Sequence, residues 1–286
     1  MRPLQEHETK ITRGVKFRID PAREDCFEVA QLHTGLMDFV GMGDQSMRQR
    51  LHRHMHNEMQ NLEITAQTLL DFPEAEWEVR LQMARQCWDE ARHTRLVYRR
   101  LEAHGGRKGE FPVMNYEWGI VCLMDSLEAR LTLQNRTFEA GEMDLFRQLI
   151  GTWTEAGDPE TAAMLDGILA DEVQHVRFGN RWLKRAARSN PRVLLNVARA
   201  IQHLKKVTAA LAPEPGDKNA AGIELTGWTH LQTYTNVEDR ELGQSVSSAN
   251  AVSQVGHDTV PGVLVKREVE KVGRHRSHPG SGTFAG

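Results

Sequence analysis

The sequence predicts an all-α protein built around a bundle of four long helices. Leu, Ala, Glu, Arg and Met are abundant, whereas aromatic residues make up only 6% of the 286 residues, which favours helix over strand. Apolar residues recur at helical spacing in four long stretches that Gly and Pro residues separate. Short connections within each pair of stretches indicate two helical hairpins, and two such hairpins make a four-helix bundle.

Residues 1–44 are expected to form an N-terminal extension. Residues 1–25 are polar and predict loop, and a short helix is expected at about 26–40. Gly41 and Gly43 follow and predict the end of that helix.

Residues 45–211 are expected to form the helical domain, and its first hairpin comes from two periodic stretches. Helical periodicity extends over 45–70 and ends at a turn that contains Pro73. Because proline suits the first turn of a helix, the next helix is expected to begin at Pro73 and to run to Gly105.

The second hairpin begins with a long helical pattern at about 115–156, which Gly141 is expected to interrupt. A helix end and a new helix start are then predicted at residues 157–159. Gly157 is expected to cap the end of one helix, Asp158 to cap the start of the next, and Pro159 to be its first residue. The helix that follows is expected to reach about residue 190.

One further amphipathic helix is expected at about 191–211. Residues 212–286 are rich in Gly, Ser and Asn and predict an irregular C-terminal extension with a disordered tail.

Composition limits the possible location and partners. The formal net charge of −3 gives no support to a nucleic-acid partner. No apolar run approaches the length of about 18 residues that a membrane-spanning helix needs. The three cysteines lack a C-x-x-C spacing, and the N-terminus lacks the apolar segment of a secretory signal. These features predict a cytoplasmic protein.

The string D-E-x-x-H occurs twice, at residues 89–93 and 171–175. In a helix, residues three apart lie on one face, so Glu90 can reach one metal ion together with His93, and Glu172 together with His175. Mixed carboxylate and imidazole ligands suit iron or manganese better than structural zinc.

A pair of metal ions also needs one carboxylate from each of the other two helices. The interval from Glu58 to Glu90 (90 − 58 = 32) nearly equals the interval from Glu139 to Glu172 (172 − 139 = 33). The offset between the two halves is likewise almost constant, at 81 for Glu58 and Glu139 (139 − 58) and 82 for the motif glutamates (172 − 90). The matched spacing predicts a duplicated helical hairpin that carries its ligands in register.

The register of the second hairpin selects Glu139 over Glu128. In the numbering, Glu172 follows Gly157 by 15 (172 − 157), and Glu139 precedes it by 18 (157 − 139). Glu128 precedes Gly157 by 29 (157 − 128), which displaces it from Glu172 by about 21 Å at about 1.5 Å per residue. Glu139 is therefore predicted to face Glu172.

The chain resembles the ferritin-like di-iron carboxylate superfamily, and more closely the ferritin-like bacterial family DUF455. The resemblance covers about residues 45–190 and is carried by HNEMQNLE, DEARHTRL, TFEAGEMD and DEVQHVRFGNRWL. It implies a ferritin-like four-helix bundle with metal ligands at Glu58, Glu90, His93, Glu139, Glu172 and His175.

Three further acidic residues are expected near these ligands. The resemblance suggests that Asp89 and Asp171 accept hydrogen bonds from the remaining ring N–H groups of the ligand histidines. Glu63 lies about 140° round the helix from Glu58 and is expected to support the site or the fold without binding metal.

These expectations lead to a non-haem di-iron oxidoreductase with two iron ions and O₂ as co-substrate, although a Mn/Fe or manganese pair fits the same ligands. It would hydroxylate, N-oxygenate or desaturate a small organic substrate, with an external electron donor such as a ferredoxin or a flavin reductase. Helical phase suggests a substrate cavity lined by Leu62, Thr65, Thr132 and Asn135. The chain is expected to be a monomer or a homodimer.

Two other functions remain open from the sequence. One is a ferritin-like iron-binding protein or ferroxidase, and the other is an enzyme similar to tRNA hydroxylases. The run His52, His54 and His56 is expected to lie on a solvated helix face.

Overall fold

The computed structural model describes residues 8–225, 259–260 and 263–264, and its architecture in this part of the chain is all-α, as predicted. Two short β-hairpins accompany the helices. The helices are α1 (Asp44–Asp71), α2 (Trp77–Ala103), α3 (Tyr116–Val121), α4 (Leu127–Leu131), α5 (Glu139–Glu155), α6 (Pro159–Ser189) and α7 (Val193–Leu211). The strands are β1 (Thr9–Thr12), β2 (Val15–Arg18), β3 (Thr259–Val260) and β4 (Val263–Leu264).

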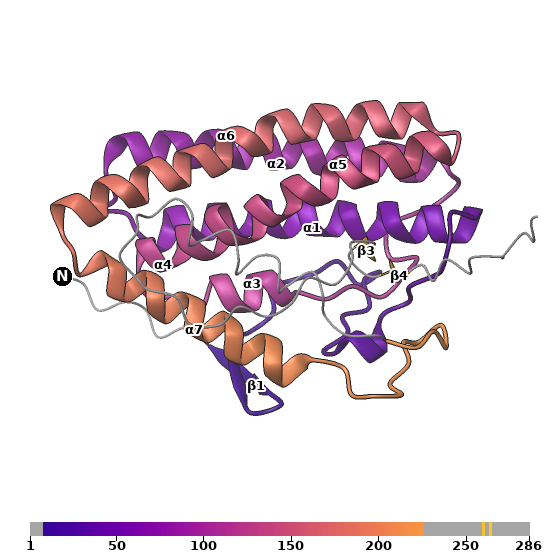
Figure 1. Ribbon diagram of the computed structural model, residues 1–286, viewed down its shortest axis with the longest axis horizontal. Helices are drawn as coiled ribbons and strands as arrows, with labels where there is room; N and C mark the ends of the chain where they lie inside the picture. Colours follow the sequence, from indigo (N-terminus) through magenta and orange to yellow (C-terminus); the bar gives the residue numbers. More distant parts are fainter. Residues whose placement is uncertain (1–7, 226–258, 261–262, 265–286) are drawn as a thin grey trace, which may run out of the picture.

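Four long helical elements form a bundle of two hairpins. Helix α1 packs along α2, α5 packs along α6, and α2 and α6 bring the two hairpins together (Figure 1). The third element of the bundle is composite, because the π-helical segment Thr132–Phe138 joins α4 to α5.

Apolar side chains fill both ends of the bundle and leave its middle polar. Along α2, the buried Met83 and Val97 lie on either side of Glu90 and His93. The two apolar clusters belong to different ends of the bundle, one around Met55, Leu101, Phe146 and Leu165, and the other around Val79, Met83, Leu131 and Phe178.

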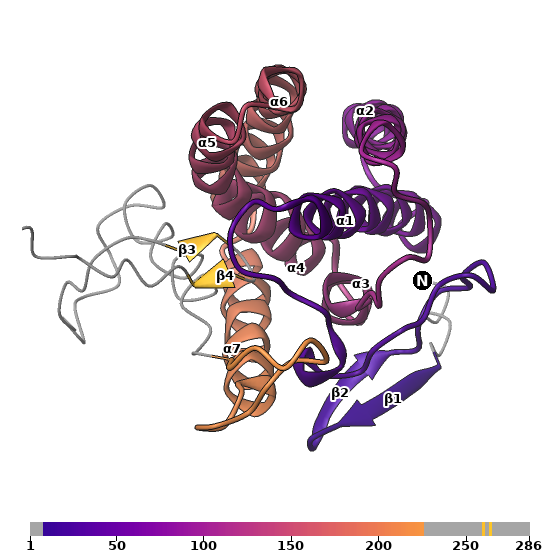
Figure 2. The same cartoon turned by 90° about the vertical axis from the view of Figure 1, so that its right-hand side faces the viewer.

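A second layer covers the side of the bundle that α1 and α4 form. Figure 2 shows α3, α7 and the β1–β2 hairpin on this side, away from α2 and α6. Their shared core contains Phe17 of β2, Trp118 of α3 and Leu204 of α7. This layer fixes the outer face of α1 and of the composite element.

The N-terminal extension differs from the expected loop and short helix. Residues 9–18 form an antiparallel hairpin whose two turn residues, Arg13 and Gly14, have φ angles of 47° and 76°. The short helix expected at 26–40 is wrong, since this stretch holds only the 3-10 turn His33–Gly35. The backbone of residues 28–30 instead pairs with Val113, whose carbonyl accepts from the Ala30 amide at 2.8 Å.

The single helix expected at about 115–156 is also wrong, because the chain breaks between α3 and α4. Ser126 caps the start of α4 by accepting from the Ala129 amide at 3.3 Å. The buried Arg130 guanidinium donates to the carbonyls of Met124 and Cys122 at 3.0 and 3.1 Å, so it satisfies backbone groups that the break leaves free. Gly141, the predicted interruption, lies inside α5.

The predicted start of α6 is confirmed, whereas the predicted start of α2 is not. Gly157 has a φ of 84°, and the Asp158 side chain accepts from the Thr161 amide at 3.0 Å directly before α6. Helix α2 begins at Trp77, and Pro73 lies in the preceding turn.

Beyond α7, residues 212–225 are irregular, and Asn219 donates to the Asp38 carbonyl at 3.0 Å. The tail expected to be disordered lies outside the described residues. Among the helices that the structure describes, none has the length and apolar character needed to cross a membrane.

Candidate metal centre

The structure brings the six predicted ligands together in the middle of the bundle. They form two groups, and within each group the ligand atoms lie within 4.8 Å of one another. Both groups contain Glu90 and Glu172, so these two carboxylates lie between the groups. All six side chains are buried, and the most exposed residue, His175, is only 4% exposed. Glu58 and His93 complete one group, and Glu139 and His175 complete the other.

Each element of the bundle supplies its part of the centre at the same level. Glu58 comes from α1, the E-x-x-H pairs come from α2 and α6, and Glu139 is the first residue of α5 after the π-helical segment. Glu128 of α4 belongs to neither group, as the hairpin register predicts.

Each histidine turns one ring nitrogen toward the glutamates. His93 Nδ1 lies 3.3 Å from oxygens of both Glu90 and Glu172, and 3.5 Å from Glu58 Oε2. His175 Nδ1 lies 3.3 Å from Glu172 Oε2 and 3.5 Å from Glu90 Oε1. Nδ1 is therefore the nitrogen that each histidine offers to a metal ion.

The other ring nitrogen of each histidine meets an aspartate from the opposite hairpin. His93 Nε2 lies 3.3 Å from Asp171 Oδ2, and His175 Nε2 lies 3.3 Å from Asp89 Oδ2. Arg92 donates to both aspartates. The predicted aspartate partners are thus in place, and each pair joins α2 to α6.

The side-chain amides of Gln86 and Asn135 hold Glu139 in place, a role that the sequence analysis did not predict. Asn135 Nδ2 donates to Glu139 Oε2 at 3.0 Å, and Gln86 Nε2 donates to Glu139 Oε1. Asn135 also donates to Gln86 Oε1 at 2.9 Å. Gln86 lies four residues before Glu90, and Asn135 lies four residues before Glu139. This spacing puts each amide on the same helical face as a candidate ligand, and it is visible in the sequence. Gly179 of α6 lets Asn135 approach this closely.

The three histidines of α1 are less exposed than expected. His54 Nε2 lies 2.7 Å from Glu58 Oε1, so this half-buried histidine positions a candidate ligand. His52 and His56 are buried, and the solvated-face interpretation is therefore wrong for them. His52 Nε2 instead accepts from the Gly109 amide at 2.9 Å.

Glu63 and the expected cavity residues lie elsewhere. Glu63 Oε1 accepts from Arg23 at 2.6 Å, and this ion pair lies outside both groups of candidate ligands. Thr65 packs against the π-helical segment, where its hydroxyl accepts from Gln134 at 2.7 Å. The cavity beside the centre is lined by other side chains than Leu62, Thr65, Thr132 and Asn135.

Crowding of buried carboxylates shifts the ionisation of the centre. Burial and the neighbouring Glu172 raise the pKa of Glu139 to about 8 and raise the pKa of Glu90 well above its usual value. Burial lowers the pKa of His175, but hydrogen bonds to Asp89 and Glu172 outweigh it and raise the pKa to about 11. Without a bound cation, the raised pKa values of Glu90, Glu139 and His175 favour the protonated forms of these groups.

The residues of the two groups could hold metal ions. Glu58 Oε2 and Glu172 Oε1 are buried and accept no well-aligned hydrogen bond among the described residues, since their nearest donor, His93 Nδ1, lies 3.5 and 3.3 Å away. Both oxygens belong to residues of the candidate groups. Four ionised glutamates would carry a charge of −4, which two divalent ions balance while both imidazoles stay neutral. Buried carboxylates require such compensation.

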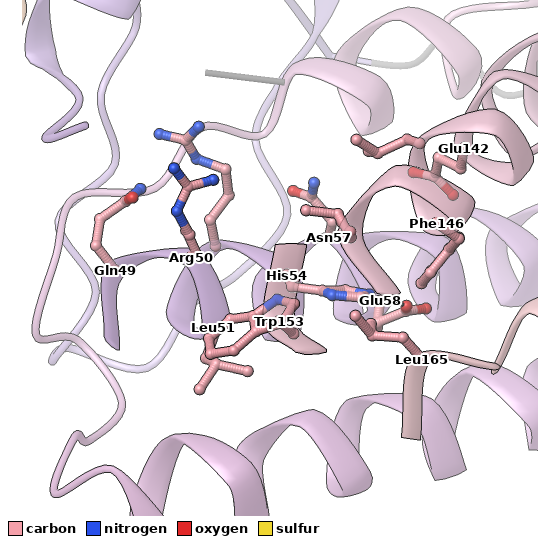
Figure 3. Close-up of a pocket in the computed structure, with 13 residues that line it drawn as sticks. Gln49, Arg50, Leu51, His54, Asn57, Glu58, Glu142, Phe146, Trp153 and Leu165 are labelled. Atoms are coloured by element: carbon pink, nitrogen blue, oxygen red, sulfur yellow. Dashed lines mark hydrogen bonds and ion pairs between the residues drawn. The ribbon is translucent and has the colours of Figure 1, made fainter. Parts of the chain in front are cut away.

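A cavity between α1 and α5 reaches the centre at Glu58 (Figure 3). The space between its walls, including its opening to solvent, is about 700 Å³. One carboxylate of the centre therefore lies in the wall of a cavity whose other walls are largely apolar.

The fold and the site together define an all-α protein with a buried glutamate and histidine centre that is able to hold metal ions. The chain belongs to the family described as Protein of unknown function (DUF455), whose model matches residues 4–214. Neither a curated protein nor a solved structure matches the chain.

Proposed function

We propose that this protein is a non-haem di-iron oxidoreductase that uses O₂ to oxidise a small organic substrate. The observation that carries the proposal is the pair of buried ligand groups that share Glu90 and Glu172. The resemblance of both D-E-x-x-H motifs to the ferritin-like di-iron superfamily supports iron as the metal. Two iron(II) ions held there would supply electrons and coordination positions for O₂.

The chain's own residues hold and orient the proposed centre. Glu90 and Glu172, together with the pairs Glu58–His93 and Glu139–His175, would hold the ions. The aspartate partners keep Nδ1 of each histidine directed at the centre. Apolar layers on both sides of the centre exclude water.

The cavity favours substrate oxidation over iron storage. It lies against Glu58, and its lining is largely apolar, as in sites that bind organic molecules. Oxidation of the substrate by O₂ would also need an external electron donor.

Metal analysis and O₂ uptake test the proposal. Anaerobic loading with Fe(II) should give two iron ions per chain, and the loaded protein should consume O₂ when a reductant is supplied. Glu90→Ala should lose at least one ion, whereas Glu102→Ala, at an exposed position of the same helix, should keep both. A stoichiometry of zero or one would refute the di-iron centre, and accumulation of many ions per chain would support a ferroxidase instead.

A further inference from the structure

The cavity beside the candidate metal centre has two chemically different ends. Figure 3 shows Gln49 and Arg50 at one end, and Glu58, Glu142 and Phe146 at the other. Arg50 and Glu58 are eight residues apart on α1, which corresponds to about 12 Å of helix rise. A molecule that spans this cavity meets a guanidinium at one end and the metal centre at the other.

The wall between the two ends is largely apolar. The apolar side chains that line the cavity come from α1, α5 and α6, and they are Leu51, Leu145, Phe146, Leu149, Trp153 and Leu165. Asn57 and His54 add polar atoms near Glu58. Such a lining favours an apolar molecule with few polar groups at defined positions.

Arg50, at one end of the cavity, holds an unused hydrogen-bond donor. Its Nε and Nη2 donate to Ser46 Oγ and to the Gly41 carbonyl, each at 3.3 Å. Its Nη1 is buried and has no hydrogen-bond partner among the described residues, and no carboxylate of those residues forms an ion pair with it. An unpaired donor on a partly buried cation is unfavourable until an anion binds it.

The surrounding charges set the charge of that anion. Arg53 also lines the cavity, but it forms an ion pair with Asp38. The cluster of Arg50, Arg53 and Asp38 therefore carries one net positive charge, which matches a monoanion.

We propose that this cavity binds a monocarboxylate with an apolar body, and that Arg50 binds its carboxylate. The apolar body lies along Leu51, Phe146 and Trp153, and its far end points to Glu58. The proposal rests on the proposed function in that it names the substrate class of the same centre. It assigns to Arg50 the role of a specificity-determining residue, because guanidinium and carboxylate form paired hydrogen bonds.

Binding of three eight-carbon probes to the full chain tests the proposal. Octanoate, octanol and octyl phosphate are titrated by calorimetry under nitrogen, into protein exposed to Fe(II). We expect saturable binding of octanoate and at least about tenfold weaker binding of octanol, since a charged hydrogen bond contributes about that factor. Equal binding of octanoate and octanol would overturn the proposal, as would absence of octanoate binding or octyl phosphate binding at least about tenfold tighter than octanoate.

Three variants locate the binding site. Arg50→Gln should weaken octanoate binding at least about tenfold and leave octanol binding within about twofold. Leu145→Trp should weaken binding of both probes by filling the cavity, and Arg99→Gln, an exposed position of α2, should change neither. Unchanged octanoate binding in Arg50→Gln, in a protein with unaltered helical circular dichroism, would overturn the role of Arg50.

Failure of this proposal is distinguishable from failure of the di-iron function, because binding is measured without O₂. Protein that binds octanoate through Arg50 but consumes no O₂ supports the cavity assignment and refutes the oxidoreductase. Protein that consumes O₂ but binds no octanoate refutes the cavity assignment alone.

Discussion

Replacement of Gly179 by alanine tests how tightly α6 supports the candidate metal centre. A Cβ atom at this position would lie 2.6 Å from Asn135 Cβ and 3.3 Å from Asn135 Cγ. The first distance is well short of the 3.4 Å at which ordinary carbon contacts begin. Asn135 is fully buried, and its amide donates to Glu139, so the side chain has no free space into which it can move.

Two opposing effects set the expected stability of Gly179→Ala. Alanine is favoured over glycine inside a helix by about 1 kcal/mol. Overpacking of a buried contact costs about 1–3 kcal/mol. Gly167 of the same helix separates the two effects, because a Cβ there meets nothing within 4 Å. Gly167→Ala should therefore raise the free energy of unfolding by up to about 1 kcal/mol, and Gly179→Ala should fall about 2 kcal/mol below Gly167→Ala.

Urea unfolding of both variants in the presence of a chelator measures this difference. Because Asn135 also orients Glu139, Gly179→Ala should in addition bind metal more weakly, whereas Gly167→Ala should bind it like the wild type. Equal stability of the two variants would show that the close contact between α6 and the π-helical segment is not rigid, and would refute the reasoning.

Three further predictions concern the centre and the buried histidines. Glu139→Ala should lose at least one metal ion in elemental analysis, while Glu128→Ala should retain both, because only Glu139 lies in the centre. Asp89→Ala should weaken metal binding about 10- to 100-fold in competition titrations, because Asp89 holds the outer nitrogen of a candidate ligand. Burial lowers the pKa of His56 from 6.5 to about 3, so stability should fall as pH drops from 6.5 to about 4.5, and less steeply in His56→Gln.

Each of these predictions has its own control. Metal loss from Glu128→Ala equal to that from Glu139→Ala would contradict the hairpin register. Asp144→Ala is the control for Asp89→Ala, because it also removes one negative charge but from an exposed ion pair of α5. It should bind metal like the wild type. For His56, the folded state binds fewer protons than the unfolded state between pH 6.5 and about 3, so a parallel pH dependence in His56→Gln would contradict its buried neutral state.

The sequence predicted the residues of the candidate centre because helical geometry relates them simply. Residues three apart share a face, which places Glu90 beside His93, and similar distances from the turn place Glu139 nearly level with Glu172. These relations depend only on the spacing of residues along a helix, so they can be predicted without knowing how the side chains pack. Their role as metal ligands stays a prediction.

The break before α4 and the π-helical segment depend on tertiary contacts that spacing does not reveal. Arg130 is only 1% exposed, and its guanidinium satisfies the carbonyls that the break leaves free. Sequence patterns place arginine at the surface, so they give no sign of this interior role. The π-helical segment contains no Gly or Pro that would mark it in the sequence, and its contacts with Gly179 and Gln86 exist only in the folded bundle.

The cavity was expected on the wrong side of Glu58. Leu62 and Thr65 follow Glu58 along α1, but the π-helical segment fills that side, where Gln134 donates to Thr65. The observed cavity extends toward the beginning of α1, past His54 and Leu51. Helical phase predicts which residues of α1 share a face with Glu58. It does not predict which part of that face another segment of the chain covers.

The reciprocal histidine and aspartate pairs have a consequence for assembly and for origin. Neither hairpin alone completes either group of ligands, because each group takes residues from α2 and α6. Full metal affinity would therefore arise only after both hairpins have docked, and metal loading would report a finished fold. Since each hairpin carries the same set of glutamate, aspartate and histidine residues, two copies of one such hairpin, associated about a two-fold axis, would form the same centre.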